Sequence, residues 1–154
     1  MAMAFSIRIP FIEQIGCELQ RFEDGEAEIS LDVQEQHTNS FGVAHGGLLM
    51  TLLDVAMAHA ARSLNLSQTD GGPGLVTIEM KTTFMRPGVG AIRALGSVLH
   101  STASLAFTEG KVLDSKGRVC AHATATFKFL RGLPVSEREV RPAAVPVLQG
   151  PGSD

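Results

Sequence analysis

The sequence contains no tryptophan and no tyrosine, and it has only two cysteines, Cys17 and Cys120. Because it also lacks a run of basic residues that would follow a nucleic-acid backbone, we expect no nucleic-acid partner. The two cysteines are not in C-x-x-C spacing, so we expect reduced thiols in a cytoplasmic protein, packed as small apolar side chains. No group of His, Cys and Asp residues has metal-ligand spacing, and we expect neither a metal nor a cofactor.

The sequence also lacks a segment suited to a membrane or to export. The longest apolar run, residues 48–61, is interrupted by Thr51, Asp54 and His59, which makes it a poor membrane span. The N-terminal stretch 5–15 does not have the basic-then-apolar layout of a signal peptide. We therefore expect no membrane partner, and we expect His59 to be a packed or rim histidine.

Acidic side chains are scarce in one half of the chain. The net charge is −3, but residues 81–131 carry six more basic than acidic side chains, whereas residues 1–80 carry eight more acidic than basic ones. A locally basic region in an acidic protein fits an anionic ligand that contacts this region. Solvated strand faces would give the same pattern, so both interpretations stay open.

The length of the chain predicts one domain, which we place at residues 1–130. Residues 131–154 hold four of the seven prolines and no periodic pattern, and we interpret them as a disordered tail. Segment 5–15 predicts a short helix. Segment 26–33 alternates apolar and polar side chains and follows an Asp-Gly turn signal, so it predicts a hairpin with residues 17–22.

Segment 48–64 predicts the one long helix of the domain. It is rich in Leu, Ala and Met, has almost no β-branched residues, and is apolar nearly all round, which is typical of a helix buried on every side. At 1.5 Å per residue it would be about 25 Å long. Four strands are predicted after it, at residues 75–85, 91–101, 105–114 and 118–130.

The predicted fold class is α+β. One helix cannot be buried on all sides by a flat sheet, so the sheet must curl around it and a second copy of the chain must cover the rest. A curved antiparallel β-sheet wrapped around one long central helix resembles the hotdog fold.

Two features of segment 37–54 point to chemistry. Gly46-Gly47 opens the predicted helix, where free backbone N–H groups at a positive helix end can be approached closely, as an oxyanion site requires. Asp54 lies within the apolar helix without a basic helical neighbour, and a buried carboxylate is unfavourable unless it is paired or functional. A simple turn and a structural aspartate capped by N–H groups remain the alternatives. The sequence has no G-x-S-x-G motif and no cysteine beside a base.

These residues, read together as His37-Thr38-Asn39, His45-Gly46-Gly47 and then Asp54, resemble the hotdog-fold acyl-CoA thioesterases of the PaaI-like, phenylacetate-pathway branch. The resemblance continues through residues 76–80, 84–87 and 105–107, and it covers residues 11–130. It implies hydrolysis of an acyl-CoA thioester to the free acid and coenzyme A.

The resemblance also implies catalytic roles for single residues. The Gly46 backbone N–H would polarise the thioester carbonyl, and His45 and Asn39 would hold the thioester or the attacking water. Asp54 would be the general base or the nucleophile. Thr77 matches a position where relatives place Ser or Thr to hold the water or the carboxylate.

Other interpretations remain open for three of these residues. Asn39 also fits an Asx turn, His45 fits a hydrogen bond at the helix entry, and Thr77 fits a residue chosen for its strand propensity. The candidate substrate-binding residues are Gly47, Phe41, Met50 and Arg86, the last as a contact for coenzyme A phosphates.

The spacing of Gly46 and Asp54 has a geometric consequence. Eight residues on one helix put them about 12 Å apart, whereas a base must lie about 3 Å from the water that it activates. One chain therefore cannot present both groups to one thioester, but two antiparallel helices that meet across a two-fold axis can. We expect a homodimer or a dimer of dimers with active sites at the subunit interface.

Two other functions remain possible from the sequence. A hotdog-fold acyl-thioester dehydratase or hydratase would need a histidine as acid or base, and His45 is the available candidate. A non-catalytic acyl-CoA-binding sensor would need a fused DNA-binding segment, and we expect none because the stretch before Cys17 is neither long nor basic enough. The acyl group depends on which side chains line the pocket; the candidates are Phe41, Leu48, Met50, Met57 and Phe84.

Overall fold

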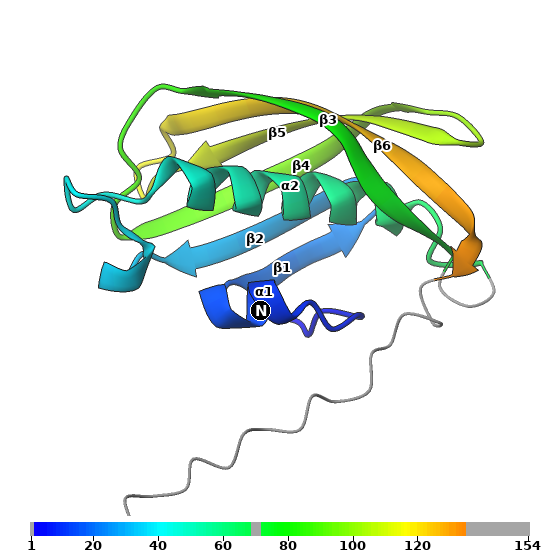
Figure 1. Cartoon of the computed structure of the whole chain (residues 1–154), viewed down its shortest axis with the longest axis horizontal. Coiled ribbons are helices and arrows are strands. Elements are labelled where there is room, and N and C mark those ends of the chain that lie inside the picture. Colours follow the sequence, from blue (N-terminus) through cyan, green and yellow to red (C-terminus); the bar gives the residue numbers. More distant parts are fainter. Residues whose placement is uncertain (1, 69–71, 135–154) are drawn as a thin grey trace, which may run out of the picture.

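The computed structural model describes residues 2–68 and 72–134, and in this part of the chain one antiparallel sheet of six strands curls around one long helix (Figure 1). The strand order is β1-β2-β4-β5-β6-β3. This is the α+β arrangement predicted from the sequence. The strands are β1 (Glu18–Glu23), β2 (Glu26–Asp32), β3 (Pro73–Phe84), β4 (Ala91–Ser101), β5 (Leu105–Leu113) and β6 (Val119–Pro134).

The N-terminal helix α1 spans Pro10–Ile15 and is shorter than predicted. The proline ring fixes a helical φ at the first position, and it also restricts Ile9, which is extended with a φ of −123°. The residues before it run beside β1 instead, where the Met3 N–H donates to the Leu19 carbonyl at 2.8 Å. A short 3₁₀ helix, Glu35–His37, follows β2.

The predicted hairpin of β1 and β2 is confirmed, and its turn explains why. Asp24 has a φ of 49° and Gly25 a φ of 78°, so both central residues are in the left-handed region. A two-residue turn of this kind matches the twist of the flanking strands, and Asp-Gly is a favoured sequence for it. The Gly25 N–H also donates to the Ser63 hydroxyl at 2.7 Å, which ties the hairpin to the end of the long helix.

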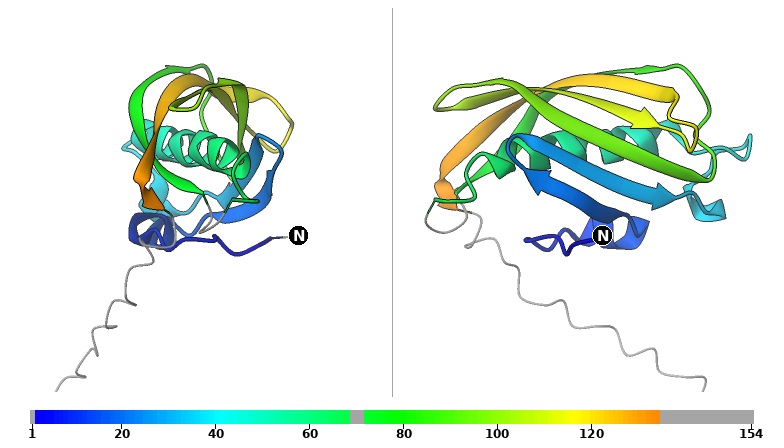
Figure 2. Two further views of the ribbon diagram at one scale, coloured as in Figure 1. Left: turned by 90° about the vertical axis from the view of Figure 1, so that its right-hand side faces the viewer. Right: turned by 180° about the vertical axis from the view of Figure 1, so that it is seen from behind.

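The long helix α2, Gly46–Ser63, crosses the concave face of the sheet (Figure 2). It contacts the sheet at a row of small residues. Ala27, Gly96, Gly110 and Ala123 are direct neighbours across β2, β4, β5 and β6. A Cβ at Gly96 would lie 2.5 Å from the carbonyl carbon and oxygen of Ala56 on the helix. Backbone atoms cannot yield as a side chain can, so the absence of a side chain at Gly96 is what lets the helix seat on the sheet.

The single chain does not bury the helix on every side, and that a second copy of the chain covers the rest stays a prediction. Leu52, Leu53 and Ala56 are fully buried against the sheet. Thr51 and Asp54, about one turn apart, lie on a stripe that is only partly buried. The sheet of one chain curls around only part of the helix, which leaves this stripe for another surface to cover.

Strand β3 is an edge of the sheet, paired only with β6 among the described strands. Its side chains Val76 and Ile78 are 41% and 54% exposed. The register shifts between Thr77 and Glu79, so Ile78 has no partner position on β6. A long edge strand with exposed apolar side chains is a surface for pairing with another chain.

The predicted strand boundaries are close to the observed ones except at the end of the domain. Strand β6 continues to Pro134, four residues beyond the predicted boundary at residue 130. Residues 135–154 of the predicted tail lie outside the described residues. No helix in the described part of the chain is long and apolar enough to cross a membrane.

A buried polar cluster at the end of α2 confirms that His59 is a packed histidine. Its Nδ1–H donates to the Val55 carbonyl at 2.8 Å, and its Nε2 accepts from Arg62 at 3.2 Å. Burial is the main cause that lowers the pKa of His59 to about 4, so the ring is neutral near pH 7. Arg62 also donates to the Ser6 hydroxyl at 2.9 Å, which links the N-terminal segment to the helix.

The row of small residues predicts the effect of one methyl group. Gly96→Ala should destabilise the protein by about 2 kcal/mol or more, because the added Cβ overlaps the α2 backbone and forces the helix outward. Ser97→Ala is the matched control, since Ser97 faces the other side of the sheet, and it should change stability by less than about 0.5 kcal/mol. Urea unfolding of both variants measures this. Equal stabilities would contradict the close contact.

Candidate active site

The loop before α2 is held by backbone hydrogen bonds that fix where the helix begins. The His45 N–H donates to the His37 carbonyl at 2.9 Å, and the Ala44 N–H donates to the Gly88 carbonyl at 2.8 Å. His37 itself is buried, and its ring accepts from the Gln34 N–H at 2.9 Å, so its role is structural. The loop is therefore anchored on both sides just before Gly46.

Asn39 uses one end of its side-chain amide to shape this loop. Its Oδ1 accepts the N–H groups of Phe41 at 2.9 Å and of Val43 at 3.4 Å, which is the Asx turn that the sequence left open as an alternative. The amide NH₂ has no hydrogen-bond partner among the described residues. Asn39 and Gly46 line the same surface depression, so the Asn39 side chain lies at the entrance of the helix.

His45 is the N-cap of α2, and its ring is engaged at the helix entry. Nδ1 accepts the Gly47 N–H at 2.9 Å, so in the neutral ring the proton lies on Nε2. The Gly46 N–H has no acceptor within the described part of the chain. A Cβ at residue 46 would lie 3.4 Å from the Phe84 ring, so a larger residue there would crowd the approach to this N–H.

Asp54 and Thr77 form a second group further along the helix. The Thr77 hydroxyl on β3 donates to Asp54 Oδ1 at 2.7 Å. Asp54 is partly buried rather than deep in the core, because it lies on the open stripe of α2. The bond leaves Oδ2 without a hydrogen-bond partner among the described residues. The carboxylate is therefore oriented through one oxygen, while the other can still accept a hydrogen bond.

The predicted catalytic residues thus fall into two separate groups within one chain. Asn39, His45 and Gly46 meet at the start of α2, whereas Asp54 and Thr77 meet two helical turns later. By helix rise the two groups are about 12 Å apart, and the depression at Gly46 does not include Asp54. Neither group alone contains both a free N–H donor and a carboxylate.

A comparison with known protein families shows which family the chain belongs to. The model of the thioesterase superfamily matches residues 41–121, more than half of the chain. The chain belongs to the thioesterase superfamily. The hotdog fold and the resemblance to the PaaI-like branch, both inferred from the sequence, are therefore confirmed.

Individual relatives of this thioesterase-superfamily chain agree with that assignment. Acyl-coenzyme A thioesterase 13 of Mus musculus is 33% identical over 102 residues, which are 60% of this chain and 69% of that protein. A conserved protein of Pseudomonas aeruginosa has a similar structure, with a TM-score of 0.73 and 30% identity over 80% of this chain and 96% of that one. The phenylacetic acid degradation protein PaaI of Thermus thermophilus, solved as a mutant, has a TM-score of 0.70 and 27% sequence identity. The match covers 79% of this chain and 100% of that one.

The remaining predicted residues of the superfamily domain have different surroundings. Phe41 stands at the loop tip with 86% of its side chain exposed, and Met50 is half-buried on α2. Gly47 is exposed, but its N–H is bound by His45. Arg86 donates to the Val119 carbonyl at 2.9 Å and lines the depression at Gly46.

The sequence did not indicate Gly88, which contacts the loop that leads into α2. Its carbonyl binds the Ala44 N–H, and a Cβ there would lie 3.2 Å from the Ala44 side chain. The signal for Gly88 in the sequence is a Pro-Gly pair, which indicates the end of a strand and nothing about a contact with the loop before α2.

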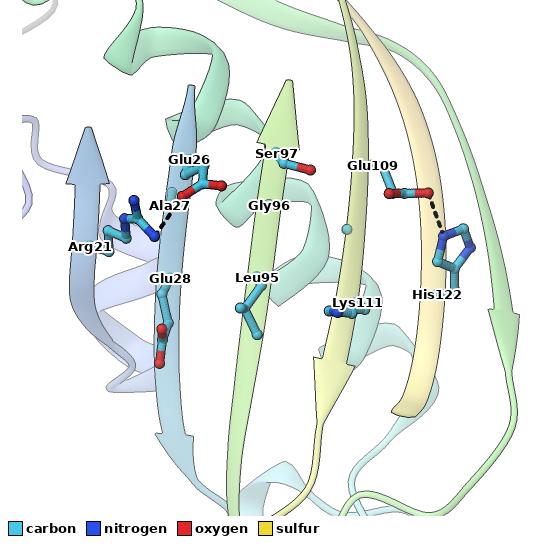
Figure 3. Close-up of a pocket in the computed structure, with 11 residues that line it drawn as sticks. Arg21, Glu26, Ala27, Glu28, Leu95, Gly96, Ser97, Glu109, Lys111 and His122 are labelled. Atoms are coloured by element: carbon cyan, nitrogen blue, oxygen red, sulfur yellow. Dashed lines mark hydrogen bonds and ion pairs between the residues drawn. The ribbon is translucent and has the colours of Figure 1, made fainter. Parts of the chain in front are cut away.

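A larger depression on the convex face of the sheet is a less suitable site (Figure 3). Its charged side chains point away from α2 and pair with one another: Arg21 with Glu26, and His122 with Glu109 at 3.1 Å. The Arg21–Glu26 ion pair neutralises one positive and one negative charge, and the His122 contact occupies a second carboxylate. Within the described residues, no three His, Cys, Asp or Glu side chains there or elsewhere are grouped to hold a metal ion.

Mutation can distinguish the effect of the Asn39 amide oxygen from that of its NH₂ group. Asn39→Ala removes the acceptor that shapes the loop, so hydrogen exchange of the Phe41 and Val43 amides should become roughly twofold to tenfold faster. Asn39→Asp keeps an oxygen at the same place and should leave both rates near wild type. Amide exchange measured by NMR checks this. Equal protection in the alanine variant would show that the loop does not depend on the side chain.

Proposed function

We propose that this chain hydrolyses acyl-CoA thioesters to the free acid and coenzyme A, with each active site shared between two subunits. The observation that carries the proposal is the 2.7 Å hydrogen bond from Thr77 to Asp54, which orients a carboxylate on the open stripe of α2. The same helix begins with a Gly46 N–H that has no acceptor among the described residues. These are the two groups that thioester hydrolysis requires.

The start of α2 would bind the thioester carbonyl. The Gly46 N–H lies at the positive end of an 18-residue helix, where a developing oxyanion is stabilised by the N–H donor and by the helix dipole. Asn39 lines the same depression and carries an NH₂ group, and His45, the neighbour of Gly46 in the chain, carries an Nε2–H. All three are donors, which suits an oxygen that gains negative charge.

Asp54 would activate the water. With Oδ1 held by Thr77, Oδ2 is free to accept a proton from water as the water oxygen attacks the carbonyl carbon. The tetrahedral intermediate then collapses, the C–S bond breaks, and the thiolate of coenzyme A leaves and takes up a proton. Direct attack by Asp54 on the carbonyl is the other role that this orientation permits.

A second subunit would bring the two groups together. The open stripe of α2 lies beside β3, whose edge exposes Val76 and Ile78. Pairing of this edge with a second copy across a two-fold axis would bury the stripe and put Asp54 of one subunit near Gly46 of the other. A homodimer with two equivalent sites meets this requirement, and so does a dimer of dimers.

The surroundings of His45 favour hydrolysis over the dehydratase or hydratase alternative. An acid–base histidine has to release and accept a proton during turnover. Here Nδ1 is already bound to the Gly47 N–H, so the ring serves as a fixed donor through Nε2. The name of the mouse relative, an acyl-coenzyme A thioesterase, supports the same choice of reaction.

The first functional prediction concerns the carboxylate. Asp54→Asn keeps the shape and removes the base, so kcat should fall by about 10²–10⁴-fold in a folded protein. Thr77→Val removes only the orienting hydrogen bond and should lower kcat by about tenfold to a hundredfold. Thiol release from a panel of short, long and aromatic acyl-CoAs measures both.

Thr126→Val is the matched control for this prediction. Thr126 also donates to a carboxylate, that of Glu79 at 3.2 Å, between the same two strands but on the opposite face of the sheet. Its loss should leave kcat within about twofold of wild type. Near wild-type turnover by a folded Asp54→Asn protein would instead make Asp54 a structural residue.

The second functional prediction tests the shared site. Asn39→Asp and Asp54→Asn should each inactivate both sites of a homodimer, but in a mixed dimer both defects can fall in one site and leave the other intact. Random re-association of equal amounts makes half of the dimers mixed, so activity should recover to about a quarter of wild type. The two variants should be co-expressed or refolded together, since folded dimers can exchange slowly.

Native mass spectrometry of the same samples provides the control. If mixed dimers are present and the activity stays as low as that of either parent, Asn39 and Asp54 serve the same site of one subunit. The shared-site arrangement would then be wrong, even if the protein is a thioesterase.

A further inference from the structure

Three basic residues surround a second depression that adjoins the one at Gly46. Arg86, Lys116 and Arg118 line it together with Asp114. Arg86 and Pro87 line both depressions, so the two form one continuous surface. This places a group of cations next to the proposed binding site of the thioester.

Asp114 holds the turn between β5 and β6 in a fixed shape. Its Oδ1 accepts the N–H groups of Lys116 and Arg118, both at 2.9 Å, and its Oδ2 binds the Arg118 guanidinium at 2.8 Å. Hydrogen bonds from Arg118 are the main cause that holds the pKa of Asp114 below its usual value, so this carboxylate is ionised. The turn is therefore built so that Lys116 and Arg118 stand at the depression in defined positions.

The positive charge of the depression exceeds its negative charge. Asp114 is the one carboxylate among its lining residues, and its oxygens are occupied within the turn. Neither Lys116 nor Arg86 makes an ion pair with a carboxylate among the described residues. Arg86 is held in place instead by its bond to the Val119 carbonyl. Two cations are thus left for an external anion.

We propose that Arg86, Lys116 and Arg118 bind the phosphate groups of the 3′-phosphoadenosine diphosphate end of coenzyme A. The proposal rests on the function proposed above, because it takes the thioester to lie at Gly46. Coenzyme A carries a diphosphate and a 3′-phosphate, whereas a phosphopantetheine arm on a carrier protein carries one phosphodiester. The two unpaired cations, Arg86 and Lys116, with the paired Arg118 beside them, match the former, and guanidinium and ammonium groups are the usual protein ligands of phosphate.

An apolar side chain in the depression suits the rest of the nucleotide. Val89 lines it and is 59% exposed, which offers a contact surface for the adenine ring. The subsite also accounts for part of the basic surplus in residues 81–131 that the sequence showed. Solvated strand faces account for the rest, such as Lys128 on β6, which is exposed and lies outside the depression.

Lys116 is the residue to change, because it contributes charge without holding the turn through its side chain. Lys116→Ala should raise KM for an acyl-CoA by about threefold to tenfold with kcat unchanged, and Lys116→Glu should raise KM further. The KM of the matching acyl-pantetheine, which has no nucleotide, should stay within about twofold of wild type in both variants. Lys128→Ala is the matched control and should change neither KM.

Binding of coenzyme A itself gives a readout that does not depend on turnover. By calorimetry, Lys116→Glu should weaken binding of free coenzyme A relative to wild type, and removal of the 3′-phosphate from coenzyme A should weaken binding to wild type. If the variants lose affinity for coenzyme A and pantetheine equally, or lose none, the phosphate subsite is wrong. A carrier-protein thioester that is hydrolysed more efficiently than the acyl-CoA would also overturn it.

The two proposals fail in different ways. If wild type hydrolyses no thioester of the panel, the proposed function is wrong, and the coenzyme A titration still decides the subsite. If wild type hydrolyses acyl-CoA and acyl-pantetheine but Lys116→Glu leaves both KM values unchanged, the function stands and the subsite is wrong.

Discussion

The close contact between the α2 backbone and Gly96 is the constraint on which the rest of the structure depends. With 2.5 Å between Ala56 and the position of a missing Cβ, the helix has one possible depth on the sheet. That seating also fixes its rotation, so that Leu52 and Leu53 face inward and Asp54 faces β3. The same position of the helix puts Gly46 next to the Phe84 ring. One steric requirement in the middle of the sheet therefore sets the positions of both groups that we propose to act in catalysis.

Strand β3 connects the core to the proposed active site because it has two functions. On one side it pairs with β6, and on its inner face Thr77 binds Asp54. Its other edge is open and carries exposed apolar side chains. The residue that orients the carboxylate therefore lies at the margin where a second chain would add. Subunit association and the geometry of the carboxylate would be linked through this one strand.

The sequence was enough to predict most of the elements of the fold. Periodicity and turn signals predicted the hairpin, the long helix and the last four strands, because these depend on local preferences. The resemblance brought Asp54 and Thr77 together correctly, although the roles of both stay predictions. The sequence could not reveal which end of the Asn39 amide the loop uses, or that Gly96 and Gly110 are neighbours. Both depend on the register between segments far apart in the chain, which no local pattern encodes.

The N-cap of α2 limits which residues can stand at position 45. The Gly47 N–H is capped by the ring of His45 through Nδ1, which has one lone pair to offer. A side chain without an acceptor at this place would leave that N–H uncapped, and the backbone around Gly46 would lose the support of a closed first turn. The imidazole ring combines this acceptor with a second nitrogen, so a single side chain can close the helix start and still present a donor.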